Sequence, residues 1–138
     1  MNWLHWAILS ALFAGLTAIL AKVGVQDVNS NLATAIRTTV ILVFAWGVAL
    51  IGGATSVWAV PSKTWLYLVL SGLATGASWL CYFRTLQLGE ASRVAPVDKL
   101  SVVVAMALAF IFLGEQFTWR HGVGGALIVT GSIVLASG

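Results

Sequence analysis

The chain has 138 residues, of which 60% are hydrophobic and only 8% are charged, and its net charge is +3. A soluble domain carries about 25% charged residues, so this composition excludes an ordinary soluble fold and indicates an integral membrane protein. The seven basic residues are scattered and too few for a nucleic-acid surface. The single Cys81 leaves neither a disulfide framework nor a thiolate metal site, and we expect no metal and no cofactor.

Five apolar segments are long enough to cross a bilayer, because a helix needs about 20 mostly apolar residues to do so. The first segment has no basic n-region and is too long for the apolar core of a signal peptide, so it is predicted to be the first span. None of the segments shows the alternation of barrel strands. We therefore predict an all-α integral membrane protein with five transmembrane helices, at residues 3–21, 32–51, 65–83, 94–113 and 119–136.

The five spans place the two termini on opposite sides of the membrane. One side of the membrane holds the loops 22–31 and 84–93. More basic residues lie near span ends on this side, namely Lys22, Arg37, Arg84, Arg93 and Lys99, than on the other side, which has Lys63 and Arg120. The positive-inside rule therefore weakly favours these two loops in the cytoplasm. So small a bias also leaves insertion in both orientations open.

Polar and aromatic side chains recur on one face of the first span and on one face of the third. In the third span these side chains lie beside Gly72 and Gly76, a GxxxG pair that allows close helix approach. Aromatic groups beside small residues line cavities, where they stack on organic or cationic molecules, but they also simply pack in helix bundles. The candidate cavity residues of the two spans are Trp6, Ser10, Phe13, Thr17, Thr75, Trp79 and Tyr82.

Asp98 and Lys99 stand near the start of the fourth span. An ionisable residue inside a span costs about 2.5–3.5 kcal/mol, so each needs a partner or water. One interpretation is a helix start, with Ser92 as the cap, Pro96 in the first turn and Asp98 complementing the helix dipole. The other places Asp98 and Ser101 at the mouth of a substrate cavity while Lys99 extends to the interface. The two roles are compatible, and the sequence leaves both open.

The remaining charges near span ends form a predicted charge network or gate. Arg37 or Arg84 could pair with Asp98 or Glu90 and so fix helix ends, and contact with an anionic substrate group is the alternative role for the two arginines. Glu115 follows the fourth span, and Arg120 or His121 is its expected partner. The network or gate candidates are Arg37, Arg84, Glu90, Lys99 and Glu115.

Four sequence elements in the second half of the chain occur in a recognisable order. LGEAS leads into VAPVDKLS, and FLGE and GVGGALIVTGSIVL follow. With the count of five spans, this order resembles the EamA domain of the drug/metabolite transporter superfamily over essentially the whole chain. Most members look like two such domains fused into ten helices, and this chain is similar to one domain, residues 1–138. The resemblance implies a carrier whose central cavity is lined largely by the first, third and fourth helices of each domain.

One departure from relatives in the same superfamily matters for mechanism. Small multidrug-resistance proteins use a glutamate in the middle of their first helix to exchange protons for cations. The first span of this chain has no acidic residue. The proton-coupled mechanism is therefore not carried over.

The fifth span is rich in glycine, and its small residues form a face suited to close helix packing. The resemblance implies that the last helix contacts the second domain, which here would be a second copy of the chain. Tight packing within one protomer is the alternative. The candidate dimer-interface residues are Gly122, Gly125, Ala126 and Thr130.

The sequence thus predicts a secondary transporter of small organic metabolites or drugs, with alternating access. It is expected to work as a homodimer of five-helix units, for which an antiparallel arrangement stays open. The alternative is a non-transporting accessory or assembly subunit of the membrane. No nucleophile and base can be placed together, so we predict no enzyme. The expected partners are the lipid bilayer, a small-molecule substrate and a second copy, and the expected location is a bacterial plasma (inner) membrane.

Overall fold

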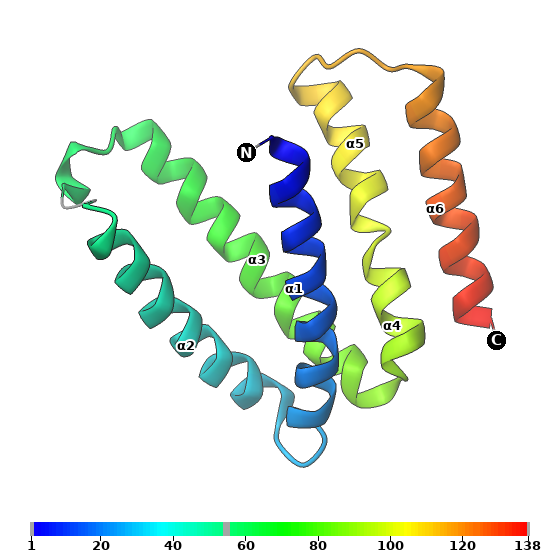
Figure 1. Ribbon diagram of the computed structural model, residues 1–138, viewed down its shortest axis with the longest axis horizontal. Coiled ribbons are helices and arrows are strands. Elements are labelled where there is room, and N and C mark those ends of the chain that lie inside the picture. Colours follow the sequence, from blue (N-terminus) through cyan, green and yellow to red (C-terminus); the bar gives the residue numbers. More distant parts are fainter. Residues whose placement is uncertain (1, 54–55, 138) are drawn as a thin grey trace. The chain divides into compact units, whose positions relative to one another are not determined.

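The computed structural model describes residues 2–53 and 56–137, nearly all of them helical (Figure 1). These residues contain no strand, so the predicted all-α fold is confirmed. A short 3-10 helix, η1 (Val57–Ala59), lies between α2 and α3. The α-helices are α1 (Trp3–Gly24), α2 (Ser30–Ile51), α3 (Ser62–Leu88), α4 (Ala91–Asp98), α5 (Ser101–Phe112) and α6 (Trp119–Ser137).

Among the described residues, four helical stretches are long and apolar enough to cross a membrane: α1, α2, α3 and the combined stretch Ala91–Phe112. The fifth predicted span corresponds to α6, a 19-residue helix. Arg120 and His121 in its first turn lower its hydropathy relative to the other four. Within the described part of the chain, the five helical stretches follow the predicted order, and each overlaps its predicted span.

A side-chain cap begins one helix, and a glycine follows the end of another. Asn29 caps α2, because its side-chain oxygen accepts hydrogen bonds from the backbone N–H groups of Asn31 (2.9 Å) and Leu32 (3.4 Å). Gly114 follows α5 with a φ of +66°, a left-handed conformation that glycine adopts without strain. These signals hold the apolar stretches apart as separate helices.

The fourth predicted span is not one continuous helix. α4 ends at Asp98 and α5 begins at Ser101, with a turn at Lys99 and Leu100. The N–H groups of Lys99 and Leu100 donate to carbonyls three residues earlier, in place of the four-residue bonds of an α-helix. Pro96 lies inside α4, where its ring and its missing N–H disturb the regular hydrogen bonding. The sequence analysis did not predict this break, although the combined stretch Ala91–Phe112 overlaps the predicted fourth span.

The start of this stretch also differs from the prediction. α4 begins at Ala91, with Glu90 in the N-cap position and no side-chain cap bond, so Ser92 is not the cap. Asp98 consequently closes α4 and does not sit in the first turn of a span. An acid at a helix C-terminus faces the negative end of the dipole, so the dipole does not explain its place.

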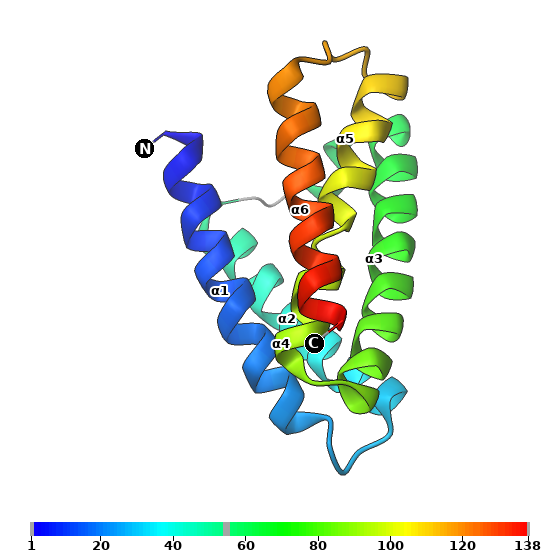
Figure 2. The ribbon, with the colours of Figure 1, turned by 90° about the vertical axis from the view of Figure 1, so that its right-hand side faces the viewer.

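The chain divides into two compact units, which we name by their helices. In the α2–α3 unit (Ala21–Gln87) the two long helices run in opposite directions (Figure 1). In the α4–α6 unit (Met1–Leu20 and Leu88–Gly138) α6 packs along α4 and α5, as Figure 2 also shows. Few apolar side chains are buried among the described residues, and they are Val25, Phe83 and Leu86 in the first unit and Ala18 and Val94 in the second.

Candidate functional site

Arg37 in α2 stacks on two aromatic rings of α3. Its Cζ lies 4.5 Å from the centre of the Trp79 ring and 5.4 Å from the centre of the Phe83 ring. Both distances fall within the roughly 6 Å over which the face of a ring attracts a cation. Trp79 and Phe83 are four residues apart, about one helical turn, so both rings reach the same guanidinium group. We call these three residues the Arg37 cluster.

The Arg37 cluster brings together two residues that the sequence analysis treated separately. Arg37 was a charge candidate and Trp79 a cavity candidate, and the structure places them in contact. Phe83 was missed, although its position one turn after Trp79 was a usable signal. It is almost fully buried and meets Tyr82 edge to face, with 6.5 Å between the ring centres.

Hydrogen bonds fix the base of the α2–α3 unit, where α3 ends. The Lys22 ammonium group donates to the Leu86 carbonyl (2.6 Å). The Gln87 amide donates to the carbonyls of Val25 (2.9 Å) and Val28 (2.6 Å), and its oxygen accepts from Arg84 (3.1 Å). These bonds tie the α1–α2 loop to the last turn of α3, one turn below Phe83. Gln87 therefore anchors the turn of α3 that follows Phe83, and Arg84 bonds to the Gln87 oxygen.

Thr75, a predicted cavity residue, is exposed and donates its hydroxyl proton to the Ser71 carbonyl (2.9 Å) one turn earlier. Its oxygen keeps lone pairs with which it can accept a further hydrogen bond. A Cβ atom built at Gly72 or Gly76 meets no other atom within 4 Å. The close helix approach predicted for this GxxxG face is therefore not made inside the described part of the chain, and the face is open.

In the α4–α6 unit, the polar groups bond to one another at the break between α4 and α5. The Ser132 hydroxyl of α6 donates to the Pro96 carbonyl (2.8 Å), which also accepts from the Lys99 backbone N–H (3.1 Å). Ser132 is buried. Its bond gives the Pro96 carbonyl a second donor and links α6 to the end of α4. Sequence analysis missed Ser132, because nothing in helical spacing connects it to Pro96.

The predicted charge residues of the α4–α6 unit have local partners. The Lys99 ammonium lies 3.7 Å from an Asp98 oxygen, and the Arg93 guanidinium lies 3.2 Å from a Glu90 oxygen. All four side chains are at least one-third exposed, so each ion pair is weak. Ser101 is exposed at the start of α5. Pairing of Arg37 or Arg84 with Asp98 or Glu90 would join residues of different units and stays a prediction.

His121 is held by a small local cluster at the start of α6. Its Nδ1 accepts the Thr118 backbone N–H (3.1 Å), and its ring lies edge-on to Phe110 at 5.5 Å between centres. Glu115 is exposed and forms no ion pair within residues 2–53 and 56–137. The bridge predicted from Glu115 to Arg120 or His121 is thus not formed in this conformation, and the function of Glu115 stays a prediction.

The candidates of the first span lie on α1, where Trp6, Ser10 and Phe13 are exposed and Thr17 is partly exposed. Trp6 is 59% exposed and Phe13 is 62% exposed. Both rings are therefore available to a ligand, a lipid or a second copy. Their place in a substrate cavity stays a prediction.

The four dimer-interface candidates divide between two faces of α6. Gly125 is buried, and a Cβ atom there would meet the Met106 side chain at 3.2 Å, while Gly122 has Phe117 at 3.1 Å. These two glycines therefore face side chains of their own unit, and their place in a dimer interface stays a prediction. Ala126 and Thr130 are exposed. Successive residues of a helix turn by about 100°, so Thr130 shares its exposed face with Val123, Leu127 and Val134.

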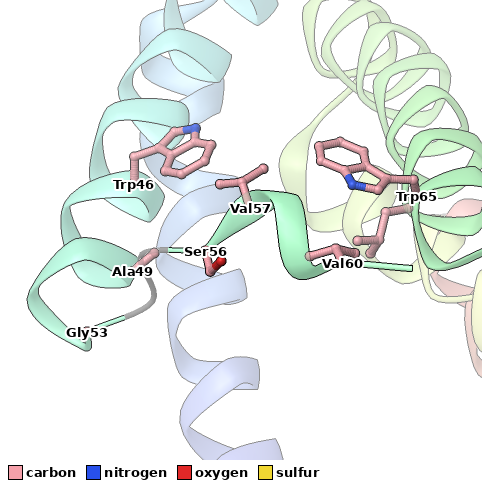
Figure 3. A pocket seen from close by; sticks show the side chains of 8 residues that line it. Trp46, Ala49, Gly53, Ser56, Val57, Val60 and Trp65 are labelled. Carbon is pink, nitrogen blue, oxygen red and sulfur yellow. The ribbon is translucent and has the colours of Figure 1, made fainter. Parts of the chain in front are cut away.

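A pocket of about 510 Å³ lies at the other end of the α2–α3 unit, beside η1. Figure 3 shows the Trp46 and Trp65 rings on opposite sides of Val57, with Ser56 and Val60 below them. The lining side chains are uncharged, so the pocket suits an apolar or planar group. Sequence analysis did not predict this pocket, and the only signal was the pair of tryptophans toward the facing ends of two spans.

The model of the EamA-like transporter family matches residues 1–137. The chain belongs to this family. A Sinorhizobium sp. protein described as an uncharacterized transporter in the cobO 3′ region is 52% identical over 139 residues, which cover 98% of this chain and 96% of that protein. No solved structure gives a significant match. The EamA resemblance predicted from the sequence is therefore confirmed.

The family and the relative support a membrane transporter rather than an enzyme. With the apolar helices, they also support an integral, multi-pass membrane protein.

Proposed function

We propose that this chain is a secondary transporter of small organic metabolites or drugs, which works by alternating access as a homodimer of five-helix units. The observation that carries the proposal is the match of one transporter-family domain to residues 1–137, nearly the full length of the chain. Many carriers consist of two repeats that rock around a binding site near the middle of the membrane. A chain with one such repeat would obtain the second from another copy.

The exposure of small and polar side chains within the spans supports self-association. Gly72, Thr75 and Gly76 form an open face on α3, and Thr130 lies on an exposed face of α6. Small residues allow helices to approach closely, and hydroxyl groups bond across such contacts. The proposal therefore places the exposed α6 face, Val123, Leu127, Thr130 and Val134, against a second copy. The two copies are parallel or antiparallel.

The substrate path in this proposal follows the third and fourth spans. Trp79, Thr75 and Tyr82 of α3 would line it, with Asp98 and Ser101 at the α4–α5 break near one mouth. An interrupted helix supports this placement, because discontinuous helices with unwound backbone surround the binding sites of many carriers. The α1 face of Trp6, Ser10, Phe13 and Thr17 would complete the lining.

The proposal puts the protein in a bacterial plasma membrane, with the loops 22–31 and 84–93 in the cytoplasm. Lys63 and Lys99 then lie near opposite sides. An impermeant amine reagent applied to intact cells should modify Lys63 and spare Lys99. Modification of both lysines in the same cells would instead indicate that the chain inserts in both orientations.

Cysteine crosslinking tests the dimer. Cys81 is exposed, so the single-cysteine variants are made in a Cys81→Ser background. Leu127→Cys lies near the middle of α6 and should give crosslinked dimers, whereas the equally exposed Leu66→Cys on α3 serves as the control. Val123→Cys crosslinking to itself indicates a parallel dimer, and crosslinking to Val134→Cys indicates an antiparallel one.

Flux into liposomes tests transport itself. The reconstituted protein should exchange a labelled amino acid, amine, nucleoside or organic acid across the bilayer, and empty liposomes should not. A protein that stays monomeric at every α6 position and moves none of these solutes would be an accessory subunit, and the transporter proposal would fail.

A further inference from the structure

Arg37 carries a positive charge within a membrane-spanning helix. It is the seventh residue after Ser30, so it lies about 10 Å along α2 from the start of the helix. Its side chain is half-buried and stacked on Trp79 and Phe83. In the part of the chain that the structure describes, no protein acceptor bonds to its N–H groups. Among the described residues, the cluster therefore holds a cation whose N–H groups bond to no protein acceptor.

The two rings attract the guanidinium charge but accept no ordinary hydrogen bond from its N–H groups. A charged side chain inside a span pairs with another group or reaches water. Water or an anion at the N–H groups would therefore complete the surroundings of Arg37.

The surroundings of Arg37 exclude an acid from its own helix pair. Neither α2 nor α3 contains an aspartate or glutamate. The whole α2–α3 unit has the four basic residues Lys22, Arg37, Lys63 and Arg84 but only one acid, Asp27 in the exposed α1–α2 loop. The positive charge is therefore uncompensated within the unit, and neither helix of the pair brings a carboxylate to the cluster.

We infer that Arg37 binds the anionic oxygen group, a carboxylate or a phosphate, of a small organic substrate. The guanidinium fork matches such groups with two parallel hydrogen bonds, and Trp79 and Phe83 fix its plane in advance. The inference rests on the proposed transport function and narrows it to organic anions. Gln87 and the base of the unit support the site by holding the last turns of α3 in place.

Thermal unfolding of the purified protein in a neutral maltoside detergent tests the site. The probes are succinate, benzoate and glycerol 3-phosphate, each beside a neutral counterpart: succinamide, benzamide and glycerol. At least one anion should raise the unfolding temperature while its counterpart does not, because a ligand that binds only the folded state stabilises it. If no anion has more effect than its counterpart, the inference is overturned without any variant.

Two variants connect the effect to Arg37. Arg37→Gln removes the charge and should weaken the apparent affinity for the anion by at least about tenfold. Arg37→Lys keeps the charge but loses the planar fork of N–H donors. Its affinity for the anion should lie between those of Arg37→Gln and the wild type. Lys63→Gln removes an equal charge from the same unit outside the cluster and should respond as the wild type does. An anion response that is equal in all four proteins would place the anion elsewhere.

The outcomes separate the inference from the proposed function. If the protein transports amines or nucleosides but no anion raises its unfolding temperature, the transport function is supported and the anion site is overturned. An Arg37-dependent anion response without any flux keeps the site and overturns transport. If only nanodiscs containing phosphatidylglycerol, compared with phosphatidylcholine, give an Arg37-dependent stabilisation, the anion is a lipid headgroup, and the substrate assignment is wrong.

Discussion

The two units of the chain use their charges in different ways. The α2–α3 unit holds four basic residues and one acid, and the α4–α6 unit holds three of each, so the entire net charge of +3 belongs to the first. In the α4–α6 unit, Asp98 pairs with Lys99, and Ser132 bonds to the Pro96 carbonyl. In the α2–α3 unit, Arg37 lies on aromatic rings, and no acceptor among the described residues bonds to its N–H groups. Polar groups that bond within the protein stabilise the fold, whereas a held cation without an acceptor is suited to a ligand.

The largest effect on stability is expected at Phe83, the buried ring of the Arg37 cluster. Phe83→Ala should lower the free energy of unfolding by about 3–5 kcal/mol, because it removes a buried aromatic side chain and leaves a cavity. It should also weaken the anion response, since Arg37 loses one of its two rings. Phe112→Ala, at an exposed ring of α5, is the control and should change neither quantity. Unfolding in mixed SDS micelles measures the stability.

Gln87→Leu breaks the base of the same unit. It leaves the carbonyls of Val25 and Val28 without their side-chain donor and should cost about 1–3 kcal/mol. Gln26→Leu, an exposed glutamine in the same loop, should cost almost nothing. Both free energies of unfolding come from the same micelle titration. Equal effects of the two changes would mean that the bonds of Gln87 do not hold the end of α3.

Ser132→Ala tests the α4–α6 unit, where the polar group is predicted to be purely structural. Loss of the bond to the Pro96 carbonyl should cost about 0.6–1.7 kcal/mol, the range for hydrogen bonds between membrane helices. The control is Ser137→Ala, which removes a local bond at the exposed end of the same helix. The anion response of both variants should equal that of the wild type. A weakened response in Ser132→Ala would remove the contrast between the units.

The smallest effect is expected at Asp98. Its pair with Lys99 is partly exposed, so Asp98→Asn should change the free energy of unfolding by less than about 1 kcal/mol. Lys99→Gln, which removes the other partner, is the matched variant and should give a similar value. A much larger loss in Asp98→Asn alone would show that Asp98 has a second partner besides Lys99.

Composition and hydropathy were sufficient to predict the helices. Long apolar runs form helices in a bilayer because every backbone N–H and C=O group must be bonded within the segment. The break at Lys99 and Leu100 was not predicted, because the effect of Pro96 depends on where the helix begins. With Ser92 as the cap, Pro96 would have been in the first turn, where proline is tolerated. The helix instead begins at Ala91, so Pro96 lies in the interior of α4, where it disturbs the hydrogen bonding.

The site was only partly predictable, and the reason is distance along the chain. Helical spacing correctly placed Trp79 on a face with Thr75 and Tyr82, but it could not place Arg37, forty-two positions earlier, on the Trp79 ring. The bonds of Gln87 to Val25 and Val28 likewise join residues about sixty positions apart. Such pairs depend on how helices pack, and a single sequence does not carry that information.

Arginine modification followed by mass spectrometry compares the two units most directly, because one sample reports on both. Phenylglyoxal is applied to the wild-type protein with succinate, benzoate or glycerol 3-phosphate, and in parallel with their neutral counterparts. We expect at least one anion to slow the modification of Arg37, while the exposed Arg120 of the α4–α6 unit reacts at an unchanged rate. Equal rates at Arg37 with every anion and its counterpart, or equal slowing at Arg37 and Arg120, would contradict this expectation.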